Sequence, residues 1–351
     1  MKNTIYIIVL IIITISCKEE NKEIKIDKVQ DKENSTNWKV IEKNYAINDV
    51  YEIGDVRRYG IIIGENDKIH PYSKKSTIET VLEISSKYKF PILFPEGTYN
   101  FGIFIKGLEN VEIISKNAKF TGPIYIIDND SLKKSKDIKV SGVITTYYKV
   151  FMRNSKDIEF DKLIITSDIS KNSIKSSSMG CDIYAGVDYV YINELEINGV
   201  GSSADNHTLT RAALQVHGWN NNPSNLEINK ITITNCDRHA IYLTGNNHII
   251  NNINIDNYGN GNYNNVSDLE DSEKGDTQKI TGLWLNKCNN SSIGSVTINT
   301  NDSKGTYSVW LDEGNIGEPT TIEKVTLIGG DKKLPIFANE LSNCVIRKVV
   351  K

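Results

Sequence analysis

The sequence predicts an all-β solenoid, in which short parallel strands stack in successive coils, here called rungs. The first observation is repetition, because five segments between Arg211 and Leu341 align residue by residue, each with two aliphatic residues two positions apart. These segments are residues 213–218, 240–245, 282–287, 308–313 and 335–340. The second observation is their spacing of about 26 residues, with one longer interval that indicates an insertion. The third is the near absence of helical periodicity, which together with the repeat is typical of solenoids.

Each repeated segment also predicts an outward-facing position. Neighbouring side chains of a strand point to opposite faces, so the residue between the two aliphatic ones must face away from the core. Stacked rungs lie about 4.8 Å apart, so these positions form one column along the outer surface, open to solvent. The column is Gln215, Tyr242, Trp284, Trp310 and Phe337, and it extends towards the N-terminus through Phe104, Tyr125, Phe151 and Tyr184. Two interpretations stay open: a ridge on which a sugar chain stacks, or an aromatic ladder that only stiffens the sheet.

The overall composition fits this architecture. The chain has 351 residues and a formal net charge of −3, so nothing in its charge indicates a nucleic-acid partner. A solenoid grows by adding rungs, so we expect one monomeric domain over residues 37–351 despite the length. The cysteines in that range match no metal-ligand spacing and are expected to be small buried side chains. They are Cys181, Cys236, Cys288 and Cys344.

The N-terminal residues predict export. Residues 1–17 have a basic start and an apolar run too short for a membrane-spanning helix, which needs about 20 residues, so they are typical of a secretory signal. The end of this run resembles a bacterial lipobox, which implies that Cys17 is lipidated and begins the mature protein. The next three residues resemble the export tag of Bacteroidetes surface lipoproteins, which implies the outer face of the outer membrane, with the lipid as the only membrane contact. Residues 18–36 are nearly all polar and predict a disordered tether. An ordinary signal peptide with an incidental cysteine is the alternative.

The first folded residues carry a resemblance to a known superfamily. A strand at 55–60 is followed by a helix, in which Ser76 and Glu79 form a capping box, and then by a strand at 90–99 with the sequence FPILFPEGTY. This order resembles the entrance of pectate-lyase-like and polygalacturonase-like proteins. The resemblance implies a right-handed, single-stranded parallel β-helix with an N-terminal capping helix. Residues 65–70 depart from the Gly-Asp-Gly that usually follows the first strand, so the resemblance carries the fold and not the activity.

Three insertions are expected to wall one side of the outward column. Residues 168–180, 200–210 and 258–278 each precede an aromatic-bearing strand on the same edge of the solenoid. Insertions of solenoids map to the binding face, and loops on a rigid scaffold tend to carry function.

Groups that can transfer protons or bind anions gather in the middle rungs. On three consecutive rungs, spanning about 10 Å, we expect a catalytic cluster. In it His217 serves as base, Tyr242 shares the proton transfer, and Arg211 or Arg238 holds a carboxylate or sulfate group through a bidentate fork. Asp182 completes the cluster. The expected substrate-binding residues are Lys149, Arg153, Tyr184, Gln215, His239, Trp284, Lys287, Trp310, Asp312 and Glu313.

Two chemistries are weighed for this groove. Cleavage of a uronate by β-elimination needs a base and a partner for the sugar carboxylate. Hydrolysis needs two carboxylates within about 10 Å, whereas Asp182 and the Asp312/Glu313 pair are four rungs, about 19 Å, apart. Of the residues that polygalacturonases use, only the pair His217-Gly218 is present.

The leading prediction is therefore a lyase that cleaves an acidic polysaccharide, uronate-containing or sulfated. A glycoside hydrolase of the same fold, which would use Asp182 or the Asp312/Glu313 pair, and a non-catalytic glycan-binding lipoprotein are the alternatives. We expect no cofactor and no metal site. The acidic loop 268–276 could hold Ca²⁺, but it lacks the spacing of known calcium loops and is better explained as a solvated charge run.

Overall fold

The structure, a computed structural model, describes most of the chain beyond the N-terminal segment. The described residues are 38–166, 180–200, 212–236, 238–259, 280–301, 303, 305–314, 317–329 and 334–351. The predicted signal, Cys17 and the tether lie outside them, as do Arg211 and most of the three insertions. The chain divides into a small unit that ends at Lys43, in which residues 38–42 are helical, and a larger unit from Asn44 to Lys351. None of the helices in the described ranges is both long and apolar enough to cross a membrane.

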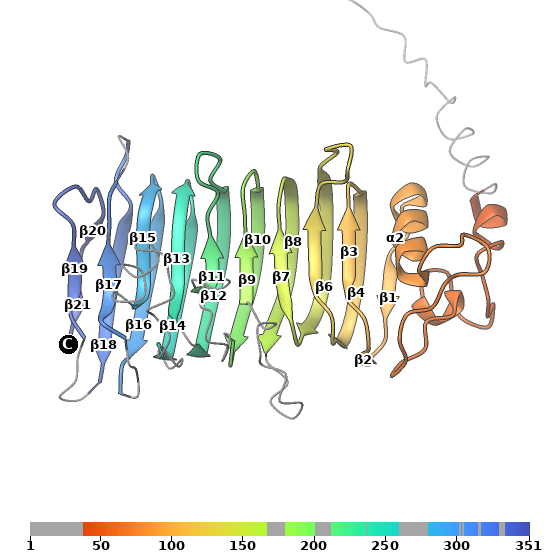
Figure 1. Cartoon of the computed structure of the whole chain (residues 1–351), viewed down its shortest axis with the longest axis horizontal. Helices are drawn as coiled ribbons and strands as arrows, with labels where there is room; N and C mark the ends of the chain where they lie inside the picture. Colours follow the sequence, from red (N-terminus) through yellow and green to blue (C-terminus); the bar gives the residue numbers. More distant parts are fainter. Residues whose placement is uncertain are drawn as a thin grey trace, which may run out of the picture. The chain divides into compact units, whose positions relative to one another are not determined.

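The larger unit is a parallel β-helix, as predicted, and all pairings between its named strands are parallel (Figure 1). One face consists of the odd-numbered strands β3 (Ile103–Lys106), β5 (Ile124–Ile127), β7 (Lys149–Met152), β9 (Gly180–Ile183), β11 (Ala212–Val216), β13 (His239–Asn246), β15 (Thr281–Asn289), β17 (Tyr307–Leu311) and β19 (Ile336–Ala338). The other face consists of β4 (Glu109–Phe120), β6 (Ser135–Thr146), β8 (Ser155–Thr166), β10 (Asp188–Asn198), β12 (Ser224–Cys236), β14 (Ile249–Tyr258), β16 (Ser292–Asn299) and β18 (Thr321–Ile328). At the two ends, β1 (Ile92–Phe94) and β2 (Gly97–Tyr99) pair with β4, while β20 (Val345–Ile346) and β21 (Val349–Val350) pair with β18.

The register of the odd-numbered face confirms the outward column, with one correction. Directly paired residues run Phe104, Tyr125, Phe151, Asp182, Gln215, Tyr242, Trp284, Trp310 and Phe337. Tyr184 was expected in this column, but Asp182 occupies the place. The reason is that Cys181 takes the slot of an aliphatic residue and is as fully buried as Ile183, which is how a small apolar thiol behaves in a core.

The corner between the two faces is a column of left-handed residues. Seven residues stack there with φ between 46° and 60°: Asn110, Asp137, Asp157, Tyr189, Asn225, Asn247 and Asn290. Asparagine and aspartate tolerate this conformation better than other residues with a side chain. Neighbouring amides also bond along the stack, since Asn290 Nδ2 donates to Asn247 Oδ1 at 2.7 Å. The seven successive rungs from β4 to β16 therefore turn at the same place.

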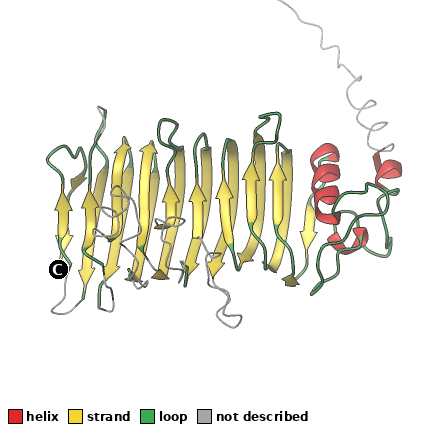
Figure 2. Ribbon diagram, viewed as in Figure 1, coloured by secondary structure: helices red, strands yellow, loops and turns green. Residues whose placement is uncertain are grey.

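The N-terminal end of the β-helix is closed by helix α2 (Thr77–Tyr88), the long helix shown in red in Figure 2. The predicted cap is confirmed, because Ser76 Oγ accepts from the Glu79 amide at 3.2 Å. The helix packs on the first rung, where Ser86 Oγ donates to the Glu109 carbonyl at 2.6 Å.

The strand expected at 55–60 is instead a single turn of 3-10 helix, η1 (Val56–Tyr59). Asp55 caps it by accepting from the Arg57 amide, and Gly60 ends it with φ 94°, a conformation that glycine adopts at no steric cost. Only Asp55 keeps a bridge to the sheet, at Leu93.

Candidate functional site

His217, just after β11, lies at the centre of the predicted cluster. Its Nε2 is 2.5 Å from Gln215 Nε2 and 3.3 Å from Asp182 Oδ1. The Asp182 oxygen is buried and makes no hydrogen bond of good geometry within the described residues, in spite of the short distance. The neutral imidazole can accept from the Gln215 amide, and the protonated ring can donate to the Asp182 carboxylate. The ring therefore has a polar neighbour in either form.

Two tyrosines flank this histidine. The Tyr184 ring centroid lies 4.7 Å from that of His217, and the Tyr242 centroid lies 6.4 Å away on the other side. The hydroxyl of Tyr242 accepts a hydrogen bond from Asn286 Nδ2 at 3.0 Å. The β-helix thus brings residues from β9, β11, β13 and β15 to one place.

Three of these residues, His217, Tyr242 and Asn286, border a cavity of about 230 Å³, here called the His217 pocket. Its lining is His217, Trp219, Asn220, Asn222, Tyr242, Thr244, Asn286 and Lys287. The lining contains amides, a hydroxyl, a phenol and an ammonium group, but no carboxylate among the described residues. Such a set donates hydrogen bonds and favours an anionic or hydroxyl-rich ligand.

Several pocket residues were not predicted from the sequence. Asn286 lies two positions after Trp284, so strand alternation could have placed it on the outer face. Trp219, Asn220 and Asn222 belong to the turn between β11 and β12, where no periodicity assigns a direction to a side chain.

The tryptophan part of the column is buried, which corrects the expectation of an open ridge. Tyr242, Trp284 and Trp310 are only 4–6% exposed. The two indoles stack face to face, with centroids 4.4 Å apart and planes at 4°. Trp284 Nε1 donates to Asp312 Oδ2 at 3.1 Å, and Asn339 donates to the other oxygen of Asp312. These rings therefore pack against one another and against polar neighbours instead of facing solvent.

The remaining predicted residues separate into groups. Arg238 and His239 are buried near the tryptophan stack, where His239 Nδ1 accepts from the Thr281 amide at 3.0 Å and its ring lies 5.0 Å from that of Trp284. Glu313 is exposed, and its carbonyl accepts from the Lys287 amide.

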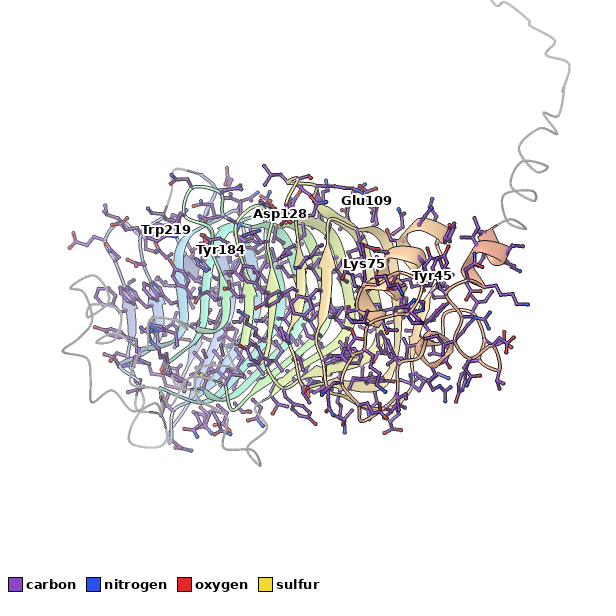
Figure 3. The ribbon with its side chains drawn as sticks, turned by 45° about the vertical axis from the view of Figure 1, so that its right-hand side comes forward. Tyr45, Lys75, Glu109, Asp128, Tyr184 and Trp219 are labelled. Atoms are coloured by element: carbon purple, nitrogen blue, oxygen red, sulfur yellow. The ribbon has the colours of Figure 1, made fainter. Side chains whose placement is uncertain are left out.

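Lys149 and Arg153 lie on the N-terminal side of the His217 pocket. Figure 3 shows the order of the rungs along the stack through Asp128, to which Arg153 binds, then Tyr184 and Trp219.

No metal-binding group is found among the described residues, in that no three His, Cys, Asp or Glu side chains gather with the geometry for an ion. The acidic loop 268–276 lies outside the described residues. The described cysteines are all free thiols.

Comparisons of the chain with protein-family models, with curated proteins and with solved structures find no match. The case for a function therefore rests on the residues themselves.

Proposed function

We propose that this protein cleaves an acidic polysaccharide by β-elimination in the His217 pocket. The observation that carries the proposal is the position of His217 Nε2, between an amide donor and the buried Oδ1 of the part-exposed Asp182 carboxylate. A general base needs a stable place for the proton it receives, and Asp182 offers that to the imidazolium.

The pocket supplies a group for each part of the reaction. His217 Nε2 gives up its hydrogen bond from Gln215 and takes the proton from C5 of a uronate. The electron pair of the C5–H bond forms the C4–C5 double bond as the bond from C4 to the glycosidic oxygen breaks. Tyr242 gives a proton to the departing oxygen, and the hydrogen bond from Asn286 to its Oη stabilises the charge that the phenol then carries. The ammonium group of Lys287 neutralises the sugar carboxylate, where negative charge grows as C5 loses its proton. Arg238, predicted for that role, is buried, and Arg211 lies outside the described residues.

A glycoside hydrolase of the same fold is less well supported. Hydrolysis uses two carboxylates flanking the scissile bond. Asp182 is near the pocket, but the Asp312 carboxylate already accepts hydrogen bonds from Trp284 and Asn339. A glycan-binding protein without activity would need the same pocket, so experiment must separate these functions.

The proposed cellular location rests on residues 1–36. Their signal, lipobox and polar tether support a lipoprotein on the outer face of the outer membrane, where a polysaccharide is the partner. The proposed chemistry uses protein side chains alone, without a cofactor, and one monomer holds the whole pocket.

The test is to incubate the full chain with a panel of uronate-containing and sulfated polysaccharides. The ultraviolet absorbance of unsaturated uronates reports elimination. His217→Ala should lower the rate by about 100-fold or more, since general acid–base groups typically contribute that much. Glu227→Gln, on the exposed part of β12, is the matched control and should leave the rate unchanged.

Other outcomes would redirect the proposal. New reducing ends without the absorbance would indicate hydrolysis. Binding without any product would indicate a glycan-binding protein. An unchanged rate in folded His217→Ala would remove His217 from the mechanism.

A further inference from the structure

The N-terminal part of the outward column, continued by Tyr184 just after β9, is a path of rings that leads to the His217 pocket. Ring centroids are 5.1 Å apart between Phe104 and Tyr125, 5.7 Å between Tyr125 and Phe151, and 6.2 Å between Phe151 and Tyr184. Tyr184 in turn contacts His217. Phe104 is 39% exposed and the other three rings are half-buried, so all four reach the surface.

Two lysines lie over these rings. Lys106 Nζ is 5.5 Å from the Phe104 centroid, and Lys149 Nζ is 5.0 Å and 5.6 Å from those of Tyr125 and Phe151. Neither ammonium group forms an ion pair within the described residues. Such groups attract an anion, and the ring faces hold them in place by cation–π contact.

Arg153 plays a different part on this path. Its Nε and a terminal nitrogen both donate to Asp128 Oδ1, at 2.9 Å and 2.8 Å, and Asn154 donates to the other oxygen of the buried Asp128 carboxylate. Its charge is already balanced, so we assign Arg153 to holding the rung and not to the ligand.

The path has an end beside helix α2. A cleft of about 270 Å³ separates that helix from β3, with Phe104 and Lys106 on one side and Glu79 and Glu83 on the other. These carboxylates pair with Lys75 and repel a polyanion that extends further. From Phe104 to Gln215 the column advances by four rungs, roughly 19 Å, or about one sugar unit per rung.

The opposite end of the column ends at Phe337, which has the same exposed fraction as Phe104, 39%. Its ring lies near those of Tyr307 and Trp310. In the described part of the chain no lysine or arginine lies over its ring. Among the described residues, the two ends therefore have the same kind of ring with the same exposed fraction, but only Phe104 has an ammonium group over it.

We propose that Phe104, Tyr125, Phe151 and Tyr184, with Lys106 and Lys149, form a track that binds about four units of an anionic sugar chain on one side of the His217 pocket. The proposal rests on the proposed function, because it takes the pocket as the place where that chain is cut. Sugar C–H faces lie on the rings, and the carboxylates of the chain lie near the two ammonium groups.

The experiment measures binding of the full chain, with His217→Ala to prevent cleavage. The probes are polygalacturonate and alginate, each beside its carboxyl-reduced, neutral form, by calorimetry. We expect tighter binding of the anionic forms, a roughly fivefold loss in Tyr125→Ala or Phe151→Ala, since stacked rings contribute that much, and no loss in Phe337→Ala. Lys149→Gln should weaken binding and reduce its dependence on NaCl concentration. Thermal melting shows whether each variant remains folded.

The outcomes separate this proposal from the proposed function. Equal affinity for anionic and neutral polymers, no binding to either polymer, an equal loss in Phe337→Ala, or unchanged affinity in the track variants would overturn the track. If binding depends on the track but no polymer yields unsaturated product, the track stands and the lyase proposal fails. If product forms and Lys149→Gln and Phe151→Ala change neither KM nor kcat, the lyase proposal stands and the track fails.

Discussion

Two stretches of one column of side chains behave differently although the backbone places them alike. Phe104, Tyr125 and Phe151 reach the surface under lysines, whereas Trp284 and Trp310 are almost fully buried. All five follow the same register and alternate with core residues of the same kind.

The difference shows what register decides and what it leaves open. Strand pairing fixes the direction in which a side chain leaves the sheet. How much of that side chain meets water depends on its neighbours, since Tyr242 is only 6% exposed while Tyr125, with the same ring in the same column, is half-buried. Indoles at consecutive rungs stack with parallel planes, while the smaller rings meet edge to face at 80° and 68° and leave room for ammonium groups.

The largest expected effect tests the contrast in burial directly. Trp284→Ala removes a stacked indole and its hydrogen bond to Asp312, so the free energy of unfolding should fall by about 3–5 kcal/mol. Phe151→Ala, on the open stretch, should cost about 1 kcal/mol, because a half-exposed ring loses less on truncation. Urea denaturation of both variants measures the two values, and similar losses would show that the stretches do not differ energetically.

The second prediction concerns the loss of stability at acid pH. Burial lowers the pKa of His248, next to the corner between β13 and β14, to about 4, although its bond to the Thr244 carbonyl opposes this. The unfolded chain protonates this side chain near pH 6.5, so stability is full above that pH and is lost as pH falls from 6.5 towards 4. The loss should reach about 3 kcal/mol, at 1.36 kcal/mol per pKa unit. Urea denaturation from pH 7 to pH 4.5 should show this slope, and His248→Gln should flatten it; a slope that survives in the variant would implicate other groups.

The open stretch should resist mild acid better. Burial raises the pKa of Asp128, but the hydrogen bonds from Asn154 and Arg153 outweigh it, and the net pKa lies below its usual value. Its contribution is present above pH 3.8 and is lost only as pH falls through the lowered pKa. Hydrogen exchange at pH 5 should therefore leave β5 and β7 protected while β13 and β14 open.

The substitution Asp128→Asn should lower the free energy of unfolding by about 1–2 kcal/mol at neutral pH. The loss stays small because Arg153 is part-exposed and water replaces some of the lost attraction.

The smallest expected effect is a gain in stability. Tyr189 occupies the left-handed corner column with φ 53°, where six other rungs have Asn or Asp, and it is 52% exposed. A bulky residue is strained in that conformation. Tyr189→Asn should therefore raise the free energy of unfolding by about 1 kcal/mol, as measured in urea. A loss of stability would mean that the contact between its ring and Lys156 outweighs the strain.

The sequence predicted the stack well because its signal is repeated. Aliphatic pairs such as Leu214 with Val216 recur in most rungs, so the register and the convergence of Asp182, His217 and Tyr242 could be predicted. The pattern gave the wrong column residue in one rung. There Cys181 occupies an inward position that an aliphatic residue occupies elsewhere, so Asp182 and not Tyr184 lies in the column. The sequence pattern also could not predict the burial of Trp284. The stacking of two indoles depends on three-dimensional packing, which the spacing of aliphatic residues does not encode.

The left-handed corner has an evolutionary consequence. Because seven successive coils turn at the same place and stack their core residues in the same register, one coil can follow another without a new interface. Duplication within the gene of a segment such as residues 124–149 would insert a further Tyr125 into the column and move the end of the stack outward by one repeat. A lineage with this architecture could thus change the length of the proposed track in whole steps, leaving the residues of the His217 pocket untouched.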